Sequence, residues 1–255
     1  MNRKKAFVAI GVVLMVVLGV YRRIPRNTLP SETEMVTIMK EAAGTAPIPD
    51  GDKPIRRAIR DSFKYLLDEN KSYEDEVNRR FRSKYMANLL HPYSFAVDTY
   101  RQGAMTELRS LKELDQQHMA AVQRFPEVAQ SNLIGAGVSE ADANAFASGT
   151  RKGEGGGIDD FSRATDLELK WIDALLELYQ FAEDNRTRIG MHTTAELTFD
   201  DENVRSQFMA LANKADDLAD QSAKVAAVFE SGQQRRRQRM SFTTPDAGQP
   251  QVAAP

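Results

Sequence analysis

The chain has 255 residues, enough for one or two domains with a sizeable hydrophobic core. Its 34 Lys and Arg nearly balance its 36 Asp and Glu, which argues against nucleic-acid binding by bulk charge, so any charge-based function must be local. Cysteine is absent, and this excludes disulfides, thiolate metal sites, a cysteine nucleophile and a lipid-modified N-terminal cysteine.

An unbroken apolar run covers residues 6–20 and is flanked by basic residues on both sides. Extended to Tyr21, it would form a helix of roughly 24 Å against a hydrocarbon core of about 30 Å, a gap that snorkelling Lys and Arg can cover. The best candidate cleavage site, residues 17–19, is followed after one valine by Tyr21 and two arginines and does not fit a signal-peptide site. We therefore expect residues 1–21 to be an uncleaved membrane anchor; a cleaved signal and a buried core helix are the alternatives.

The orientation of this anchor follows from the charges around it. Residues 1–5 are short and strongly basic, so their translocation is disfavoured, although Arg22, Arg23 and Arg26 weaken the asymmetry. We expect a single-pass protein with a cytoplasmic N-terminus and an extracytoplasmic body.

Residues 22–52 hold four prolines around one short helical pattern, Ser31 to Ala43. Ser31 is a residue type that favours the N-cap of a helix. We interpret residues 22–52 as a juxtamembrane tether.

From Lys53 onward, apolar residues recur in steps of three and four, which predicts a long amphipathic helix. Its expected end is at His91-Pro92, because the residue before a proline is disfavoured in a helix. The pattern resumes at Val97 and predicts a second long helix that ends at Pro126.

Residues 126–157 are small, broken and rich in glycine, which predicts a crossover with two short helical pieces, the second capped by Ser139. No convincing strand-like alternation occurs anywhere in the chain. A third helix is expected from about Ile158 to Ile189 and has the widest apolar face, around Trp171.

A fourth helix shows the most regular pattern, a heptad-like seam that we expect Gly232 to end. The seam consists of Val204, Phe208, Leu211, Ala215, Leu218, Ser222, Val225 and Phe229. If the third and fourth helices fold back through a loop near Ala195, Trp171 lies opposite the small residues between Ala215 and Ser222. A coiled coil between two chains is the alternative use of the seam.

These elements predict an all-α fold, an antiparallel bundle of about four long helices over residues 53–232, behind the single N-terminal transmembrane anchor. Residues 233–255 are rich in Arg, Gln, Pro and Ala, and cannot bury enough apolar area to offset their chain entropy. We expect them to be a disordered basic and proline-rich tail.

The sequence contains only weak motifs for metal binding, phosphate binding or catalysis. Asp115 and His118 have the three-residue spacing of a bundle metal site, but they form one imperfect element where a di-iron site needs two Glu-x-x-His elements and two further carboxylates. The stretch at 152–157 lacks the strand that precedes a phosphate-binding loop, and no nucleophile motif is present. We expect no catalytic residue, no metal and no cofactor.

One feature creates a strong local positive electrostatic potential. It is a basic cluster that consists of Arg235, Arg236, Arg237 and Arg239. Such a cluster can contact an anionic surface, either lipid head groups or an envelope polymer; its alternative role is to complement the negative end of a helix dipole. Nucleic acid is not expected for an extracytoplasmic body.

Taken together, these patterns favour a non-enzymatic, membrane-anchored envelope protein whose helical bundle mediates protein–protein interaction or scaffolding, with an unidentified partner or with itself. The alternatives are a ligand-sensing bundle, for which residues 1–5 offer no inner domain, and an enzyme that uses a polar cluster within the bundle.

Overall fold

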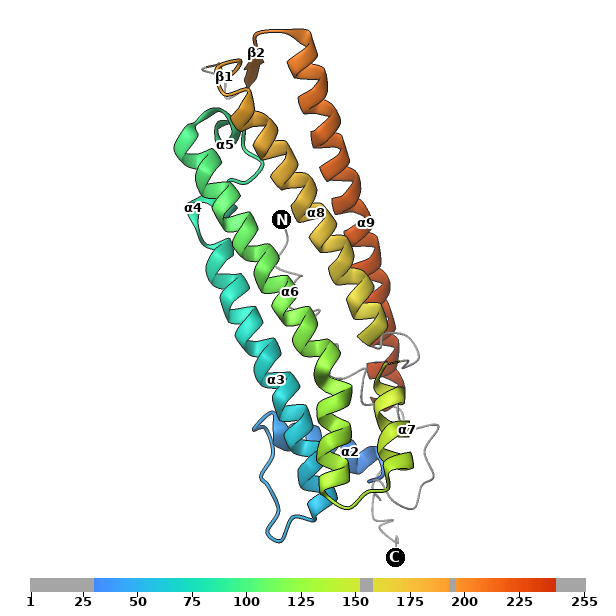
Figure 1. Cartoon of the computed structure of the whole chain (residues 1–255). Coiled ribbons are helices and arrows are strands. Elements are labelled where there is room, and N and C mark those ends of the chain that lie inside the picture. Colours follow the sequence, from blue (N-terminus) through green and yellow to red (C-terminus); the bar gives the residue numbers. More distant parts are fainter. Residues whose placement is uncertain (1–29, 152–157, 193–195, 242–255) are drawn as a thin grey trace, which may run out of the picture.

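The computed structural model describes residues 30–151, 158–192 and 196–241, and this part of the chain is mostly helical (Figure 1), which confirms the expected all-α class. Its elements are α2 (Glu32–Ala42), α3 (Pro54–Phe81), α4 (Lys84–Ala87), α5 (Pro92–Ala96), α6 (Asp98–Gly135), α7 (Glu140–Arg151), α8 (Ile158–Asp184), β1 (Ile189–Met191), β2 (Leu197–Phe199) and α9 (Glu202–Ser241). No helix within the described ranges is long and apolar enough to cross a membrane. The expected anchor at residues 6–21 lies outside them.

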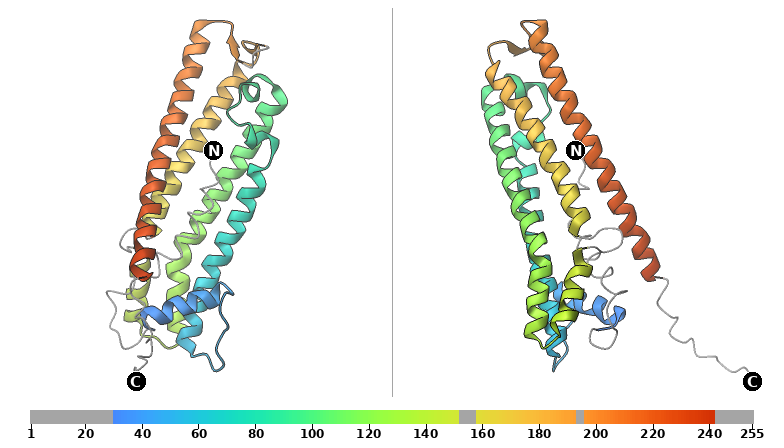
Figure 2. Two further views of the ribbon diagram at one scale, coloured as in Figure 1. Left: turned by 180° about the vertical axis from the view of Figure 1, so that it is seen from behind. Right: turned by 45° about the vertical axis from the view of Figure 1, so that its right-hand side comes forward.

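The four long helices α3, α6, α8 and α9 lie side by side and run antiparallel to their neighbours (Figures 1 and 2). Each packs mainly against the next one along the chain, so that α6 lies between α3 and α8, and α8 lies between α6 and α9. Within the described residues α3 and α9 share no substantial contact. The result is a bundle-like row of helices, which we call the helical body.

The segment interpreted as a tether contains a helix that belongs to this body. Ser31 caps α2 with a capping box: its hydroxyl accepts from the Glu34 backbone N–H, and the Glu34 carboxylate accepts from the Ser31 backbone N–H. α2 lies across one end of the row (Figure 1), where Met35 and Ile38 are fully buried against α3. We call this end of the helical body the α2 end.

The first long helix is shorter than predicted. α3 ends at Phe81, because Ser83 takes an extended conformation and its hydroxyl accepts from the Met86 backbone N–H, which starts the short helix α4. His91 then caps α5, with Pro92 in the first helical position. Residues between Phe81 and Pro92 therefore turn back over α6 and do not continue the apolar face of α3.

The predicted end of the second helix at Pro126 is wrong. α6 continues through this proline to Gly135 and buries it, together with Phe125 and Ala129, in the core. Proline removes one helical hydrogen bond and crowds the preceding turn, yet apolar packing around it can hold the helix together. The Ser139 cap is confirmed, since its hydroxyl accepts from the Asp142 backbone N–H at the start of α7.

The structure also contains one short β-hairpin, which the sequence pattern did not predict. After α8 ends at Asp184, β1 and β2 form an antiparallel hairpin in which Ile189 pairs with Phe199. Each strand has 3 residues, too short for an alternating pattern to be recognised in the sequence. The predicted loop centre at Ala195 falls outside the described residues.

The fourth helix is longer than predicted. α9 does not end at Gly232 but continues to Ser241, so the basic cluster lies on a helix and not in a tail. A glycine inside a helix costs about 1 kcal/mol and does not by itself end it. Residues 242–255 and the glycine-rich stretch 152–157 lie outside the described residues.

Candidate interaction surface

Three tyrosines converge at the end of the helical body opposite α2, where α4, α5 and the start of α6 meet (Figure 1). The Tyr100 ring lies edge to face with both other rings, with centroid distances of 5.8 Å to Tyr85 and 4.7 Å to Tyr93. His91 lies against Tyr93 at 4.1 Å. All three tyrosines are partly exposed, and we call this cluster the tyrosine surface.

The tyrosine surface depends on a glycine inside α6. A β-carbon at Gly103 would lie 2.5 Å from two ring atoms of Tyr85, much closer than any side chain allows. The absence of a side chain at Gly103 therefore lets the Tyr85 ring lie directly on the α6 backbone, one helical turn from Tyr100.

Other residues extend this surface. The Lys84 ammonium lies 5.0 Å from the Tyr85 ring centroid and 5.4 Å from that of Tyr100, within the range of cation–π contacts. Leu90 and Val97 are 57% and 39% exposed beside the same short helices. Aromatic rings with an apolar body and a polar tip, next to exposed aliphatic groups, are typical of protein-binding surfaces.

Below the tyrosine surface, a buried arginine holds the short helices in place. Arg101 is fully buried; its Nε donates to Glu183 of α8 at 2.6 Å, and its Nη1 donates to the Phe95 carbonyl at 2.8 Å. It also pairs with Asp98. Breaking these contacts would leave the buried charge of Arg101 uncompensated, which is costly. Arg101 therefore links α5, α6 and α8 firmly.

A buried tyrosine adds to this link. The Tyr179 hydroxyl of α8 lies 3.0 Å from the Ser94 hydroxyl and donates to the Leu89 carbonyl. Burial raises the pKa of Tyr179 well above its ordinary range, so its proton stays in place. The tyrosine surface is thus preorganised on a rigid base.

The predicted pair Asp115 and His118 lies in the middle of the helical body and meets two residues of α3. The His118 Nε2 donates to the Asn70 side-chain oxygen at 2.7 Å, and the Tyr73 hydroxyl donates to Asp115 Oδ1 at 2.7 Å. The rings of Tyr73 and His118 stack at 4.0 Å. We call these four residues the polar layer.

The polar layer separates two hydrophobic clusters. Along α6 the clusters are interrupted between Leu111 and Val122, where Asp115 and His118 lie. Burial lowers the pKa of His118 to about 4, and burial followed by the charge of Asp115 raises the pKa of Tyr73. His118 is therefore neutral and Tyr73 protonated at neutral pH.

The polar layer is closed and does not gather metal ligands. Asp115 is 1% exposed and His118 5%, and the Phe161 ring packs edge-on against the imidazole at 5.4 Å. Among the residues that the structure describes, no group of three or more His, Cys, Asp or Glu side chains is placed to hold a metal ion.

The seam of α9 is used unevenly. Val204, Phe208 and Ala215 are buried in the same apolar cluster as Trp171 of α8, and Leu211 and Leu218 pack against it. Further along, Ser222 and Val225 are only partly buried, and the side chain of Phe229 lies outside the described set.

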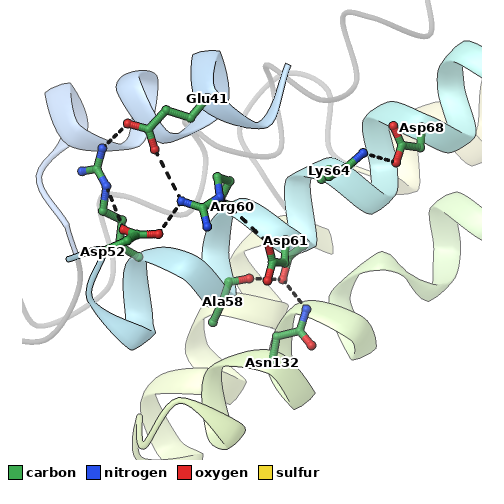
Figure 3. Close-up of polar contacts among 10 residues, drawn as sticks. Glu41, Asp52, Ala58, Arg60, Asp61, Lys64, Asp68 and Asn132 are labelled. Carbon is green, nitrogen blue, oxygen red and sulfur yellow. Dashed lines mark hydrogen bonds and ion pairs between the residues drawn. The ribbon is translucent and has the colours of Figure 1, made fainter. Parts of the chain in front are cut away.

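At the other end, an ionic network clamps α2 to α3. Glu41 of α2 pairs with Arg56 and lies 3.9 Å from Arg60, and Asp52 pairs with both arginines (Figure 3). The carboxylates of Glu41 and Asp52 are almost fully buried, so the network holds a solvent-shielded contact and not a loose surface pair.

Neither the tyrosine surface nor this clamp was predicted from the sequence. A signal for the first exists, because three tyrosines fall between residues 85 and 100, around the His91-Pro92 break. The clamp has no comparable signal, since its four charged residues look like ordinary surface charges.

Comparisons with known proteins identify no relative. No protein-family model matches the chain, and no curated protein or solved structure matches it.

Proposed function

We propose that this protein is a non-enzymatic, single-pass membrane-anchored protein whose extracytoplasmic helical bundle binds another protein through the tyrosine surface. The tyrosine surface is the observation that carries this proposal. Tyrosines dominate binding energy at many interfaces because they bury large area with few rotatable bonds, and they act best on a rigid support. Arg101 and Tyr179 supply that support.

The position of this surface supports a scaffolding role. α2 follows the proposed anchor and is clamped to α3, whereas α4 and α5, the short helices that contain Tyr85 and Tyr93, follow the far end of α3 (Figure 1). A helix of the 28 residues of α3 extends about 40 Å at 1.5 Å per residue. An anchor before α2 would therefore display the tyrosine surface away from the membrane.

The burial of the polar layer favours a structural role for it. A substrate would have to reach Asp115 or His118 past the rings of Tyr73 and Phe161, which pack on the imidazole. This supports a binding protein over an enzyme that works inside the bundle.

Photo-crosslinking in native membranes tests the proposed interaction. A photoreactive phenylalanine analogue at Tyr93 should give one discrete protein adduct, whereas the same analogue at Tyr65, a partly buried tyrosine of α3, serves as the matched control. Equal adducts at the two positions, or none at Tyr93, would contradict the proposal.

The proposed location has its own test. Membrane fractionation and N-terminal sequencing should recover an intact N-terminus in the membrane, and a reporter fused after Pro255 should be active outside the cytoplasm. A soluble product that starts near Val20 or Tyr21 would exclude the anchor, and a reporter active only in the cytoplasm would reverse the orientation.

A further inference from the structure

The tyrosine surface carries positive charge that its neighbours do not neutralise. The exposed Lys84 ammonium lies over the rings of Tyr85 and Tyr100, and the exposed Arg82 comes two residues before Lys84, in the link from α3 to α4. Within the described ranges, neither Lys84 nor Arg82 has a carboxylate at ion-pair distance. Both cations are therefore available to a binding partner.

The acidic groups of the same segment are already used inside the helical body. Residues 81–109 contain only two acidic residues, Asp98 and Glu107. Asp98 pairs with the buried Arg101, and Glu107 accepts from Arg80 of α3 at 3.4 Å. The uncompensated charge in the segment that carries the three rings is therefore positive.

The stability of α4 does not account for Lys84. This lysine is the first residue of α4, where a helix dipole disfavours a cation. Its contact with the two rings is a cation–π contact, which uses the charge of the ammonium but none of its three N–H donors as conventional hydrogen bonds. The rings thus hold the ammonium in place while its donors stay available to an acceptor from outside.

The rest of the tyrosine surface fits apolar side chains. Leu90 and Val97 are exposed beside the rings, and each tyrosine offers an apolar face with a hydroxyl donor at its tip. A segment with both carboxylates and apolar side chains would match both features. A basic segment would instead meet uncompensated like charge, which is costly at an interface.

We propose that the partner presents an acidic segment, in which Asp or Glu side chains lie next to apolar ones, and that a carboxylate of this segment pairs with Lys84. This inference rests on the proposed binding at the tyrosine surface, and it does not require the anchor. Single-stranded nucleic acid also combines stacking with cations, but it needs a positive groove along its backbone. Two cations in a chain of net charge −2 favour an acidic protein segment.

A carbodiimide tests this contact, because it joins a lysine amine to a carboxylate that touches it. The amide forms with loss of one water, which the carbodiimide takes up to become a urea. The full chain is treated in a lysate of its own cells that keeps both membranes and soluble proteins, and tandem mass spectrometry locates the amide. The photoreactive phenylalanine analogue at Tyr93 reports partner binding in parallel, without using the Lys84 amine.

Three variants separate the charge of Lys84 from its reactivity. Lys84→Arg keeps the charge but has no amine that forms the amide, and Lys84→Glu reverses the charge. Lys71→Glu is the matched control, since Lys71 is also an exposed lysine without an ion pair in the described part of the chain, but lies within α3.

We expect an amide between Lys84 and an Asp or Glu of the same protein that the photo-adduct at Tyr93 contains. Lys84→Arg should lose the amide and keep the photo-adduct. Lys84→Glu should lower the yield of the photo-adduct roughly ten-fold, because it sets like charges against each other, and Lys71→Glu should leave the yield unchanged.

Two results would overturn the inference but leave a partner on the tyrosine surface. One is a photo-adduct that forms without any amide at Lys84 and does not respond to Lys84→Glu; the other is a photo-adduct that a nuclease removes. The absence of any photo-adduct at Tyr93 would contradict the proposed function itself, and this inference with it.

Discussion

The ring of Tyr85 lies on the backbone of Gly103, so close that a β-carbon at position 103 would come within 2.5 Å of the ring. Glycine inside a helix costs about 1 kcal/mol relative to alanine. In α6 the contact with Tyr85 accounts for this glycine, since it brings the ring beside Tyr100 and completes the tyrosine surface.

This relationship predicts opposite effects of one substitution in two backgrounds. Gly103→Ala should destabilise the wild-type protein, because the overpacking cost of about 1–3 kcal/mol exceeds the gain of about 1 kcal/mol in helix propensity. In a Tyr85→Ala background the clash is absent, so Gly103→Ala should stabilise by up to about 1 kcal/mol. Denaturant unfolding, followed by the fluorescence of the single buried tryptophan Trp171, measures both values. The same sign in both backgrounds would mean that Tyr85 does not lie on Gly103.

The polar layer predicts a difference between two conservative substitutions. Tyr73→Phe removes the hydroxyl that donates to the buried Asp115 carboxylate, and should cost about 1–3 kcal/mol of unfolding free energy. Tyr65→Phe is the control, because that hydroxyl makes a longer bond of 3.3 Å to the Ala121 carbonyl and should cost no more than about 1 kcal/mol. Similar losses for the two variants would remove the special role of the Tyr73–Asp115 contact.

His118 makes the stability pH-dependent in a defined window. Burial lowers its pKa from 6.5 to about 4, so between these values the unfolded chain binds a proton that the folded chain does not. The contribution of His118 to the free energy of unfolding is complete above pH 6.5 and is lost as the pH falls through about 4. Between pH 7 and pH 4.5 the wild type should lose about 2–3 kcal/mol more than His118→Gln. Parallel curves for the two proteins would show that His118 is not the buried titrating group.

The seam predicts where α9 tolerates a large side chain. Ala215 is 3% exposed in the apolar cluster, so Ala215→Trp should overpack it and cost about 1–3 kcal/mol. Ala210 is exposed on the same helix, and Ala210→Trp should leave the stability nearly unchanged. If Ala215→Trp instead converts a dimer into a stable monomer in light scattering, the seam joins two chains and the internal pairing is wrong.

The sequence allowed the helices to be predicted more reliably than their ends. The stripe that includes Trp171 and the seam through Ala215 repeat over many residues, so several positions support each helix. Single residues set the ends, and their effect depends on packing. Pro126 stays inside α6 because its surroundings are apolar, and Gly232 stays inside α9. Neither outcome can be predicted from the spacing of the apolar residues alone.

The tyrosine surface could be predicted only in part. The three tyrosines are visible in the sequence, and so is the break before Pro92. Their convergence depends on the earlier end of α3 at Phe81, which turns Tyr85 back onto α6, and on the missing side chain of Gly103. A continuous helix to His91, as the periodicity suggests, would have placed Tyr85 on the stripe of α3 instead.

A partner protein on the tyrosine surface should add its mass to the complex in native membranes, and weighing that complex measures the proposed binding. Membranes are extracted into native nanodiscs, and the particles are weighed by mass photometry for the wild type, for Tyr93→Ala and for the control Tyr65→Phe. We predict that the wild type and Tyr65→Phe carry the additional mass of a partner and that Tyr93→Ala loses it. Equal particle masses for all three proteins would show that no partner binds through Tyr93.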